Sequence, residues 1–474
     1  VKEGYMRIEA AAKNSGMKLP RIRMTVNLAP ADIRKEGAAY DLPIAIGMLA
    51  ATGFIRKDLL DKYIILGELS LDGAIRPIKG ALPIAIQARK EGFKGFILPA
   101  ENAREAAIVD NLEVFAADNL KSVADFFNGH GELKRVEVNT REEFFENQMT
   151  YLEDFADVKG QENIKRALEI AAAGGHNVIL IGPPGAGKTM LAKRLPTILP
   201  LLTLKEALET TKIHSVAGIL SKGASLITQR PFRSPHHTIS DVALVGGGSN
   251  PRPGEISLAH NGVLFLDELP EFKREALEVM RQPMEDRKVT ISRARQTIDY
   301  PASLMLIASM NPCPCGYYNH PEKDCVCAPG IVKKYLNKIS GPLLDRIDLH
   351  VEVTPVSYDK LADYAPSPEN STLIRARVEA ARKVQDLRFE SLQDIYCNAQ
   401  MPGNMVREVC QLSTAGVTLL KNAMNKLQLS ARAYDRILKV SRTIADLEGC
   451  EEIKIEHLAE AIHFRSLDRE SWAA

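Results

Sequence analysis

The sequence predicts an α/β protein: a nucleotide-binding core on a parallel sheet, a second α/β domain before that core and a helical region after it. Three observations predict this class. The glycine-rich stretch 182–189 lies between an apolar run and a helical segment. A second apolar run, 263–266, ends in two carboxylates, as a buried parallel strand beside a binding site does. From residue 366 onward the apolar residues recur with helical spacing.

Composition limits the possible function classes. The 474 residues suffice for two or three domains, each with its own core. Because 61 Lys and Arg residues balance 60 Asp and Glu residues, any surface for nucleic acid must be local. No apolar run approaches the roughly 18 residues of a membrane span, no signal peptide is visible, and the seven cysteines suit a reducing compartment. We expect a cytoplasmic protein with no membrane partner.

Residues 1–125 are expected to form an α/β domain of their own, because strand-like and helical segments alternate along them. The expected strands are 21–27, 63–69, 96–98 and 112–115, and the expected helices are 42–50 and 84–91. The polar residues 126–150 then indicate a linker.

Four phrases of this first domain resemble, in the same order, the proteolytic domain of Lon proteases: residues 27–32, 35–37, 73–78 and 96–102. That family uses a Ser–Lys dyad, and the matching positions here carry Ala39 and Leu82. Without a hydroxyl nucleophile or an amine base there is no dyad to activate. The resemblance therefore implies a peptidase fold without peptidase activity, used for contacts. Since the sequence begins at Val1 without an initiator Met, we expect this domain to be N-terminally incomplete.

The nucleotide-binding core is expected over 151–365, and its loop has the spacing GxxxxGK[ST]. The loop residues are Gly182, Pro183, Pro184, Gly185, Ala186, Gly187, Lys188 and Thr189, with Met190 following in the helix. Glycines let the backbone N–H groups turn inward around phosphates, and the N-terminus of the next helix adds a favourable field. Lys188 is expected to reach the β- and γ-phosphates, and Thr189 to hold Mg²⁺. The loop thus predicts ATP and Mg²⁺ as ligands.

Two carboxylates, Asp267 and Glu268, follow the apolar run 263–266 directly. Doubly wound sheets place their chemistry at the carboxyl ends of strands. Asp267 can therefore orient Mg²⁺, and Glu268 can polarise the water that attacks the γ-phosphorus. The competing interpretation, plain surface charge, is disfavoured by the phosphate loop upstream. Together the two elements predict ATP hydrolysis.

About seventy residues separate the loop from the acidic strand, more than a simple doubly wound unit needs. They include the adjacent His236 and His237. Two histidines could bind a metal, but without a third ligand at fixed spacing a polar loop is the favoured interpretation. The Gly- and Pro-rich stretch 245–255 indicates a protruding hairpin or a loop inserted within a helix.

A β-hairpin is expected over 288–300, because two β-branched runs flank a short basic turn. Lys288 begins the first run, and Arg293 and Arg295 lie at the tip. Taken alone, a basic turn is most often a solvated surface. Whether these three residues contact a partner therefore depends on the rest of the chain.

The apolar run 303–308 predicts another buried strand, and Asn311 follows it. An amide at this position can hold the attacking water or contact the γ-phosphate. Asn311 is therefore expected to act as a sensor of the nucleotide.

Four cysteines follow in two close pairs, Cys313 with Cys315 and Cys325 with Cys327. Four thiolates can close a tetrahedral Zn²⁺ site. Because CxC pairs are less diagnostic than CxxC pairs, unligated thiols remain the alternative.

Arg346 precedes a further strand at 349–353. In a sheet of the usual strand order it cannot easily reach its own phosphate loop, but it could reach that of a neighbouring subunit. It is the candidate arginine finger, and we expect it to have no partner within its own chain.

Residues 366–474 are expected to form a helical lid. The expected helices are 372–387, 405–412, 415–427, 431–447 and 455–464. Arg432 opens the fourth of these helices and fits a second sensor that reaches over the nucleotide.

The chain as a whole resembles the YifB/ComM family of magnesium-chelatase-like AAA+ ATPases. Five features carry this resemblance: the inactive Lon-like domain, the long insert, the basic hairpin, the cysteine cluster and the Leu-Leu-Asp-Arg phrase that ends at Arg346. The resemblance covers nearly the whole chain. It implies an AAA+ ATPase core with a helical lid, assembled as a homo-hexameric ring with the insert and the hairpin facing its channel. It also implies DNA translocation, as a helicase that promotes branch migration in DNA uptake or recombination. Lys288, Arg293 and Arg295 would then contact phosphates of single-stranded or branched DNA rather than bases.

A second function remains open at this point. The ring could remodel a partner protein, as the ATPase subunit of magnesium chelatase does. A DNA motor needs a basic, salt-sensitive channel, whereas a remodelling ATPase needs only a partner surface. A third possibility, an ATP-dependent peptidase, is disfavoured by Ala39.

Overall fold

The computed structural model describes residues 2–465 except 18, 20–23, 30–36, 147, 149–150, 222, 249–250, 294–295, 319, 321, 357–368 and 393–394. The chain divides into two compact units. Unit 1 comprises Val1–Gln148 and Thr203–Thr228, and unit 2 comprises Met149–Leu202 and Gln229–Ala474. Across the residues described, no helix combines the length and the apolar character needed to cross a lipid bilayer.

Unit 1 is built on a four-stranded sheet in the order β1-β4-β5-β6. Its strands are β1 (Tyr63–Ile65), β4 (Gly95–Pro99) and β5 (Glu113–Ala117), which run parallel, and β6 (Lys134–Val136), which is antiparallel to β5. All five residues of β4 are buried, as a continuous apolar run at the centre of a sheet requires. At Gly95 a Cβ atom would lie 2.7 Å from the carbonyl oxygen of Glu113, so a side chain does not fit between the strands.

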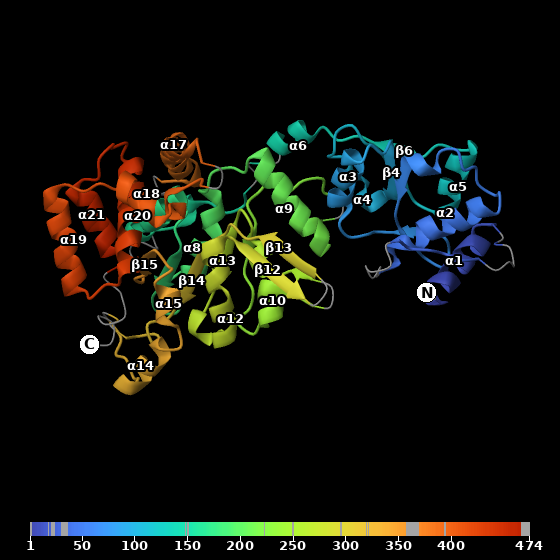
Figure 1. The fold of residues 1–474 in the computed structure, drawn as a ribbon. Coiled ribbons are helices and arrows are strands. Elements are labelled where there is room, and N and C mark those ends of the chain that lie inside the picture. The colour runs from blue at the N-terminus through green and yellow to red at the C-terminus, as the bar shows by residue number, and fades with distance from the viewer. Residues whose placement is uncertain are drawn as a thin grey trace. The chain divides into compact units, whose positions relative to one another are not determined.

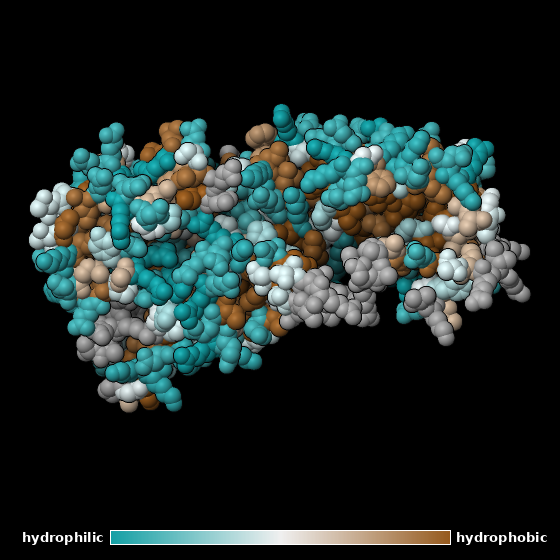
Figure 2. Space-filling view, in the orientation of Figure 1, coloured by the Kyte–Doolittle hydropathy of each residue, from teal (hydrophilic) through white to brown (hydrophobic). Residues whose placement is uncertain are grey.

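Helices and a short hairpin complete unit 1. The helices are α1 (Lys2–Asn14), α2 (Asp41–Ala51), α3 (Ala81–Lys90), α4 (Ala100–Ala106), α5 (Leu120–Asn128), α6 (Thr140–Glu146) and α9 (Leu204–Ala217), and the hairpin pairs β2 (Glu68–Leu69) with β3 (Ile75–Arg76). Aliphatic residues of α1, α2 and α5 share one core with Tyr63 and Ile97. On the face drawn in Figure 2, brown apolar residues gather beside α3 and α4.

Helix α9 comes from the insert between the phosphate loop and the acidic strand, yet it packs on α3 within unit 1. A capping box of Thr203 and Glu206 begins the helix and fixes where the chain enters this unit. The hydroxyl of Ser215 on α9 donates to the buried carboxylate of Glu105 on α4. The same carboxylate accepts the backbone N–H of Leu82 at 2.9 Å. Part of the insert is therefore a component of the first unit.

Three expectations for the first 150 residues differ from what is observed. The sequence predicts a strand at 21–27, but residues 24–27 form none, and 21–23 lie outside the described residues. The predicted strand 63–69 divides into β1 and β2, which join different sheets. The polar stretch 126–150 is interpreted as a linker from its sequence, but its residues up to Gln148 belong to unit 1 and contribute β6 and α6. Its polar composition reflects an exposed edge strand, since both lysine and arginine of β6 are exposed.

Unit 2 is built on a five-stranded parallel sheet in the order β15-β7-β14-β11-β8. The strands are β7 (Val178–Ile181), β8 (Phe232–Arg233), β11 (Val263–Leu266), β14 (Met305–Met310) and β15 (Leu349–Glu352). Side chains alternate between two cores: Val178 and Leu180 of β7 belong to one, Ile179 and Ile181 to the other. Because the strands are parallel, the carboxyl ends of β7, β11 and β14 meet at one edge of the sheet.

Helices and two hairpins surround this sheet. They are α7 (Glu162–Gly174), α8 (Lys188–Arg194), α10 (Asp241–Val245), α11 (Glu255–Leu258), α12 (Arg274–Val279), α13 (Arg281–Asp286), α14 (Pro329–Leu336) and α15 (Gly341–Leu344), with the hairpins β9 (Gly246–Gly247) to β10 (Arg252–Pro253) and β12 (Lys288–Arg293) to β13 (Gln296–Pro301). The stretch 245–255 therefore contains a hairpin, one of the two forms predicted for it. The hairpin predicted over 288–300 is also present.

In the C-terminal part of unit 2, drawn from orange to red in Figure 1, the described residues form five α-helices. They are α17 (Ser371–Phe389), α18 (Gly403–Val409), α19 (Thr414–Lys426), α20 (Ala431–Leu447) and α21 (Ile455–His463). Each lies close to a helix predicted from the apolar spacing. Helices α17 and α20 pack on α7, and their Ile374 and Ile437 complete the core on that face of the sheet.

Candidate functional site

The glycine-rich loop leaves the carboxyl end of β7 and enters α8 at Lys188. Gly185 and Gly187 have φ of 79° and 85°, in the left-handed region that favours glycine. At Gly182 a Cβ atom would lie 2.2 Å from the carbonyl oxygen of Val353, the residue after β15. Backbone geometry therefore requires these glycines, and the loop has the strand–loop–helix context that the sequence predicts.

Lys188 folds back against its own loop. Its Nζ donates to the carbonyl oxygens of Gly182 and Pro183 at 2.7 and 2.9 Å. It also donates to Oδ1 of Asn311, just beyond β14, at 3.1 Å. Burial lowers the pKa of the ammonium, and the two carboxylates after β11 oppose that shift. A phosphate chain on the loop can replace these oxygens as the acceptor without moving the lysine far.

Thr189 and Asp267 lie in direct contact, with Oγ1 donating to Oδ2 at 2.7 Å. The other oxygen of Asp267 accepts the hydroxyl of Ser309 on β14 and the backbone N–H of Glu268, the latter at 3.0 Å. A hydroxyl and a carboxylate at this separation supply the oxygen ligands that Mg²⁺ prefers. Sequence reasoning did not identify Ser309, because it lies inside an apolar strand and carries no motif.

Glu268 adopts a left-handed backbone conformation, φ 54° and ψ 49°, which is unfavourable for a residue other than glycine. Its side chain is 58% exposed, and its Oε2 lies 3.6 Å from Nδ1 of His237. Strand β8 pairs with β11, so the residues that follow the two strands share one edge. The ring of His236 lies 4.1 Å from that of His237.

Sequence reasoning named the two histidines but did not place His237 beside Glu268. Among the described residues, neither histidine belongs to a group of three metal ligands. The preference for a polar loop stays a prediction. The position of His237 beside Glu268 depends on β8, which has only two residues. A strand that short gives no periodic signal, so the position of His237 beside Glu268 could not be predicted from the sequence.

The four cysteines after β14 lie together. Their Sγ atoms are all within 4.8 Å of one another. Individual separations are 3.3 Å for Cys313 to Cys315, 3.7 Å for Cys313 to Cys325 and 3.5 Å for Cys315 to Cys325. Cys313 is buried and the other three are partly exposed, and none forms a disulfide. The donor set fits a tetrahedral Zn²⁺ site of four thiolates.

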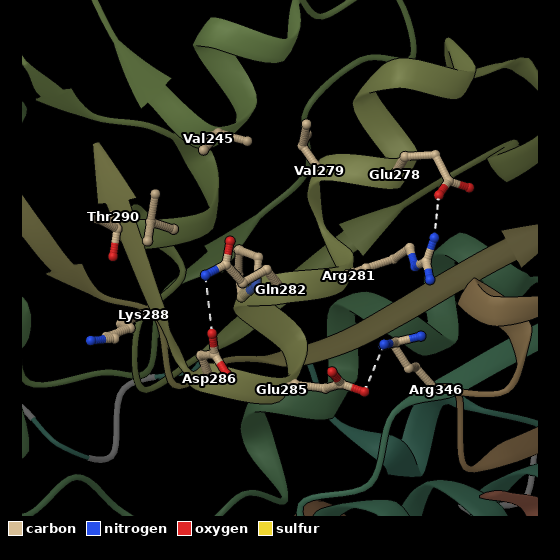
Figure 3. Close-up of a pocket in the computed structure, with 12 residues that line it drawn as sticks. Val245, Glu278, Val279, Arg281, Gln282, Glu285, Asp286, Lys288, Thr290 and Arg346 are labelled. Atoms are coloured by element: carbon tan, nitrogen blue, oxygen red, sulfur yellow. Dashed lines mark hydrogen bonds and ion pairs between the residues drawn. The ribbon is translucent and has the colours of Figure 1, made fainter. Parts of the chain in front are cut away.

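Arg346 has a partner in its own chain, which corrects the expectation that it has none. Its Nη2 lies 2.7 Å from Oε1 of Glu285 on α13, and its Nη1 donates to the carbonyl oxygen of Pro342 at 2.7 Å. The side chain is only 7% exposed. It lines a pocket of about 440 Å³ beside α12, α13 and β12 (Figure 3).

Arg432 is exposed in the first turn of α20. One turn later Arg436 donates to Oδ1 of Asp348, the residue before β15, at 2.9 Å, and Oδ2 of Asp348 accepts the backbone N–H of Asn177. Burial alone would raise the pKa of Asp348, but the guanidinium of Arg436 holds that pKa well below its usual range. This buried pair ties α20 to the sheet next to the position of Arg432.

The basic hairpin has regular register from Lys288 opposite Pro301 to Arg293 opposite Gln296. Lys288 lies at its base, where Nζ is 3.3 Å from Oδ2 of Asp299. Arg295 and the side chain of Arg293 lie outside the described part of the chain. The hairpin is confirmed, and the contacts predicted for its basic residues stay predictions.

Comparisons with known proteins give matches along most of the chain. The family model described as magnesium chelatase, subunit ChlI, matches residues 154–361, that of subunit ChlI of Mg-chelatase matches 1–102, and that of the ChlI C-terminal region matches 368–465. The YifB protein of Salmonella typhimurium is 45% identical over 473 residues, which cover 99% of this chain and 90% of that protein. Competence protein ComM of Haemophilus influenzae is 43% identical over 471 residues, with the same coverage of 99% and 90%.

A shorter similarity concerns the peptidase resemblance. Lon protease 2 of Bacillus subtilis is 32% identical over 154 residues, which cover 30% of this chain and 26% of that protease. The likeness is therefore limited to a part of both chains.

Proposed function

Because the chain belongs to the YifB/ComM family of magnesium-chelatase-like AAA+ ATPases, we propose that it hydrolyses ATP in a ring of six copies and uses the hydrolysis to move along DNA. The cluster of Lys188, Thr189 and Asp267 at one edge of the parallel sheet is the observation that carries the ATPase. The hairpin β12–β13 supports the DNA motor. In this proposal residues 151–365 are the ATPase core and 366–474 its lid.

The phosphate loop binds the triphosphate. Its backbone N–H groups surround the phosphates, and Lys188 exchanges the carbonyl oxygens of Gly182 and Pro183 for phosphate oxygens. Thr189 and Asp267 would hold Mg²⁺, which would supply positive charge to neutralise the phosphates. Glu268 accepts a hydrogen bond from the attacking water and polarises it. Asn311, which follows β14, contacts the γ-phosphate and so senses whether it is present.

Two arginines complete the proposed site. Arg346 serves as the arginine finger of a neighbouring copy and stabilises the charge on the transferred phosphoryl group. Arg432 reaches the nucleotide from the lid as the second sensor, and the ion pair of Arg436 with Asp348 keeps its helix next to the sheet.

The hairpin grips the DNA backbone. Arg293 ends β12, Arg295 follows it in the sequence and Lys288 begins the strand. With both arginines at the tip, a ring of six copies would present about twelve tip guanidinium groups. Such groups contact phosphates and carry no base preference. The relative from Haemophilus influenzae is named a competence protein, and we propose branch migration on single-stranded or branched DNA in uptake or recombination.

Two parts of the chain have supporting roles. We propose that Cys313, Cys315, Cys325 and Cys327 hold a structural Zn²⁺, because four thiolates leave no open coordination position for chemistry. We also propose that unit 1 has the fold of a Lon proteolytic domain without its activity. Leu82 is fully buried on α3, where it serves packing.

Replacing Arg293 and Arg295 by Ala tests the DNA motor. The double variant should lose DNA stimulation of the ATPase, and its affinity for branched DNA should depend less steeply on salt, because fewer counterions are released. Fluorescence anisotropy at a series of salt concentrations measures that slope. As a matched control, Lys421→Ala with Lys426→Ala removes the same charge from exposed positions on α19 and should leave the slope unchanged.

If the double variant binds and unwinds branched DNA as well as the wild type, the turn is a solvated loop. The second candidate function, remodelling of a partner protein, then becomes the better one. Two observations favour it: the matching family models are described by the magnesium chelatase subunit ChlI, and Lys288 already has a carboxylate partner in Asp299.

A further inference from the structure

We propose that Glu285 is a positioning residue that withholds Arg346 from the neighbouring copy until the hairpin β12–β13 engages DNA. The inference rests on the proposed function of Arg346 as the arginine finger. It concerns one ion pair, the helix α13 that carries its carboxylate, and the pocket beside them (Figure 3).

The ion pair holds the guanidinium inside its own chain. Nη2 of Arg346 lies 2.7 Å from Glu285, and Nη1 donates to Pro342, so two of the three nitrogens have acceptors close by. A guanidinium that is 7% exposed needs a carboxylate to offset the loss of water. Glu285 is itself 46% exposed, so it can leave this contact for water at low cost. The carboxylate therefore determines where Arg346 rests.

The resting position is also incomplete. Within the described part of the chain, the third nitrogen, Nε of Arg346, is buried without a hydrogen-bond partner. A buried donor without an acceptor destabilises the position that it occupies. An anionic phosphate, which has several acceptor oxygens, can satisfy the whole guanidinium and compete successfully with the single carboxylate.

Glu285 is mechanically linked to the hairpin. Helix α13 ends at Asp286, Arg287 follows with φ 53°, and β12 begins at Lys288. The far end of the hairpin is fixed to the same point, because the backbone N–H of Ala302 donates to the carbonyl oxygen of Arg287 at 2.8 Å. A hairpin that shifts on contact with DNA therefore shifts the end of α13 and with it Glu285.

The pocket gives Glu285 room to move, and its other charges are already paired. Nη1 of Arg281 lies 2.6 Å from Oε2 of Glu278, and Nε2 of Gln282 donates to Oδ2 of Asp286 at 3.1 Å. Figure 3 shows these contacts along α12 and α13, with Glu285 and Arg346 apart from them. Of the pairs drawn there, Glu285 with Arg346 is the one that joins α13 to the segment before β15.

Replacing Glu285 by Gln tests the proposal, because the amide keeps the size of the side chain and removes its charge. ATPase rates are measured with and without branched DNA. We expect the rate without DNA to rise about three- to tenfold, since a charge-assisted contact that opposes catalysis is lost. The ratio of the rates with and without DNA should fall accordingly. Glu278→Gln removes one charge from the same pocket without touching Arg346 and should leave both rates unchanged.

The outcomes separate this inference from the function on which it rests. A rate without DNA that stays unchanged, or that falls together with the rate with DNA, overturns the role of Glu285. If Arg346→Ala has no effect on either rate, the arginine finger itself is wrong. Glu285→Asp retains the charge and should keep a low rate without DNA. If Glu285→Gln fails to fold, the comparison of Glu285→Asp with Glu285→Ala decides the question in the same way.

Discussion

Unit 1 and unit 2 both place a carboxylate beside a β-sheet, and the partners of that carboxylate differ. In unit 1 Glu105 is 5% exposed and accepts from the backbone of Leu82 and the side chains of Asn102 and Ser215. In unit 2 Glu268 is more than half exposed at the end of β11. One carboxylate has its acceptor sites filled by the fold, and the other keeps them available to a ligand.

This difference shows why the carboxylate of Glu268 is a candidate catalytic group and that of Glu105 is not. A buried carboxylate saturated by local donors stabilises a fold and has little capacity left for substrate. Groups that meet at a strand end with partners a ligand can replace are suited to catalysis. The lysine of unit 2, held by carbonyl oxygens of its own loop, is such a group.

The largest effect should come from Glu268, the exposed carboxylate of unit 2. Glu268→Gln should lower ATP turnover by about 10²- to 10⁴-fold while ATP still binds, because the water loses its proton acceptor. Lys188→Ala should weaken binding as well. Steady-state ATPase assays and the binding of a fluorescent ATP analogue separate the two effects. Ala39→Ser in unit 1 is the control and should change neither. Equal loss of ATP binding in both unit 2 variants would count against these roles.

A smaller effect is expected when the cysteine cluster is disrupted. Protein purified without chelator should contain about one Zn²⁺ per chain, and Cys325→Ser should lose it and destabilise unit 2 by about 3 kcal/mol or more. Metal analysis and chemical unfolding measure both, and the transition of unit 1 should not move. Cys450→Ser is the control, because Cys450 lies with Glu448 and His457 in a separate group of possible ligands. Metal-free protein that unfolds normally would refute the site.

The smallest effect should come from Glu105, the buried carboxylate of unit 1 that accepts several hydrogen bonds. Glu105→Ala leaves the N–H of Leu82 and the hydroxyl of Ser215 without their acceptor, so unit 1 should lose about 2 kcal/mol. Hydrogen exchange in α3, α4 and α9 reports this loss, and the ATPase rate should be unaffected. Glu132→Ala, at an exposed position of the same unit, serves for comparison. A cost no greater than that of Glu132→Ala would mean that Glu105 does not hold α9.

The parts of the site that the sequence predicted are those determined by neighbouring residues. The phosphate loop, the strand before Asp267 and the hairpin at Lys288 each need only a short contiguous pattern, and all three are present. The cysteines are also close in sequence, and their Sγ atoms meet. Local pattern suffices where the residues that form an element lie in one short stretch of the sequence.

The remaining features depend on residues far apart in the chain. Glu285 and Arg346 meet only in the folded unit, and the pairing of β8 with β11 brings His237 near Glu268. No periodicity records such a pairing. The same reason explains why the packing of α9 on α3 was not predicted, since residues near 85 and 210 meet only in the folded unit.

Because residues 203–228 are part of unit 1, the coding sequences of the two units are interleaved, and this affects how the gene can recombine. A domain added to an ATPase by simple fusion joins it at one point and can be exchanged by one recombination event. Here the unit formed by residues 1–148 also contains a segment encoded between the phosphate loop and the acidic strand. A crossover that replaced the first 148 codons would separate Glu105 from Ser215 and leave α9 packed against residues with which it did not evolve. The two units are therefore expected to be inherited as one block, and grafts between relatives should succeed only when both segments are transferred together.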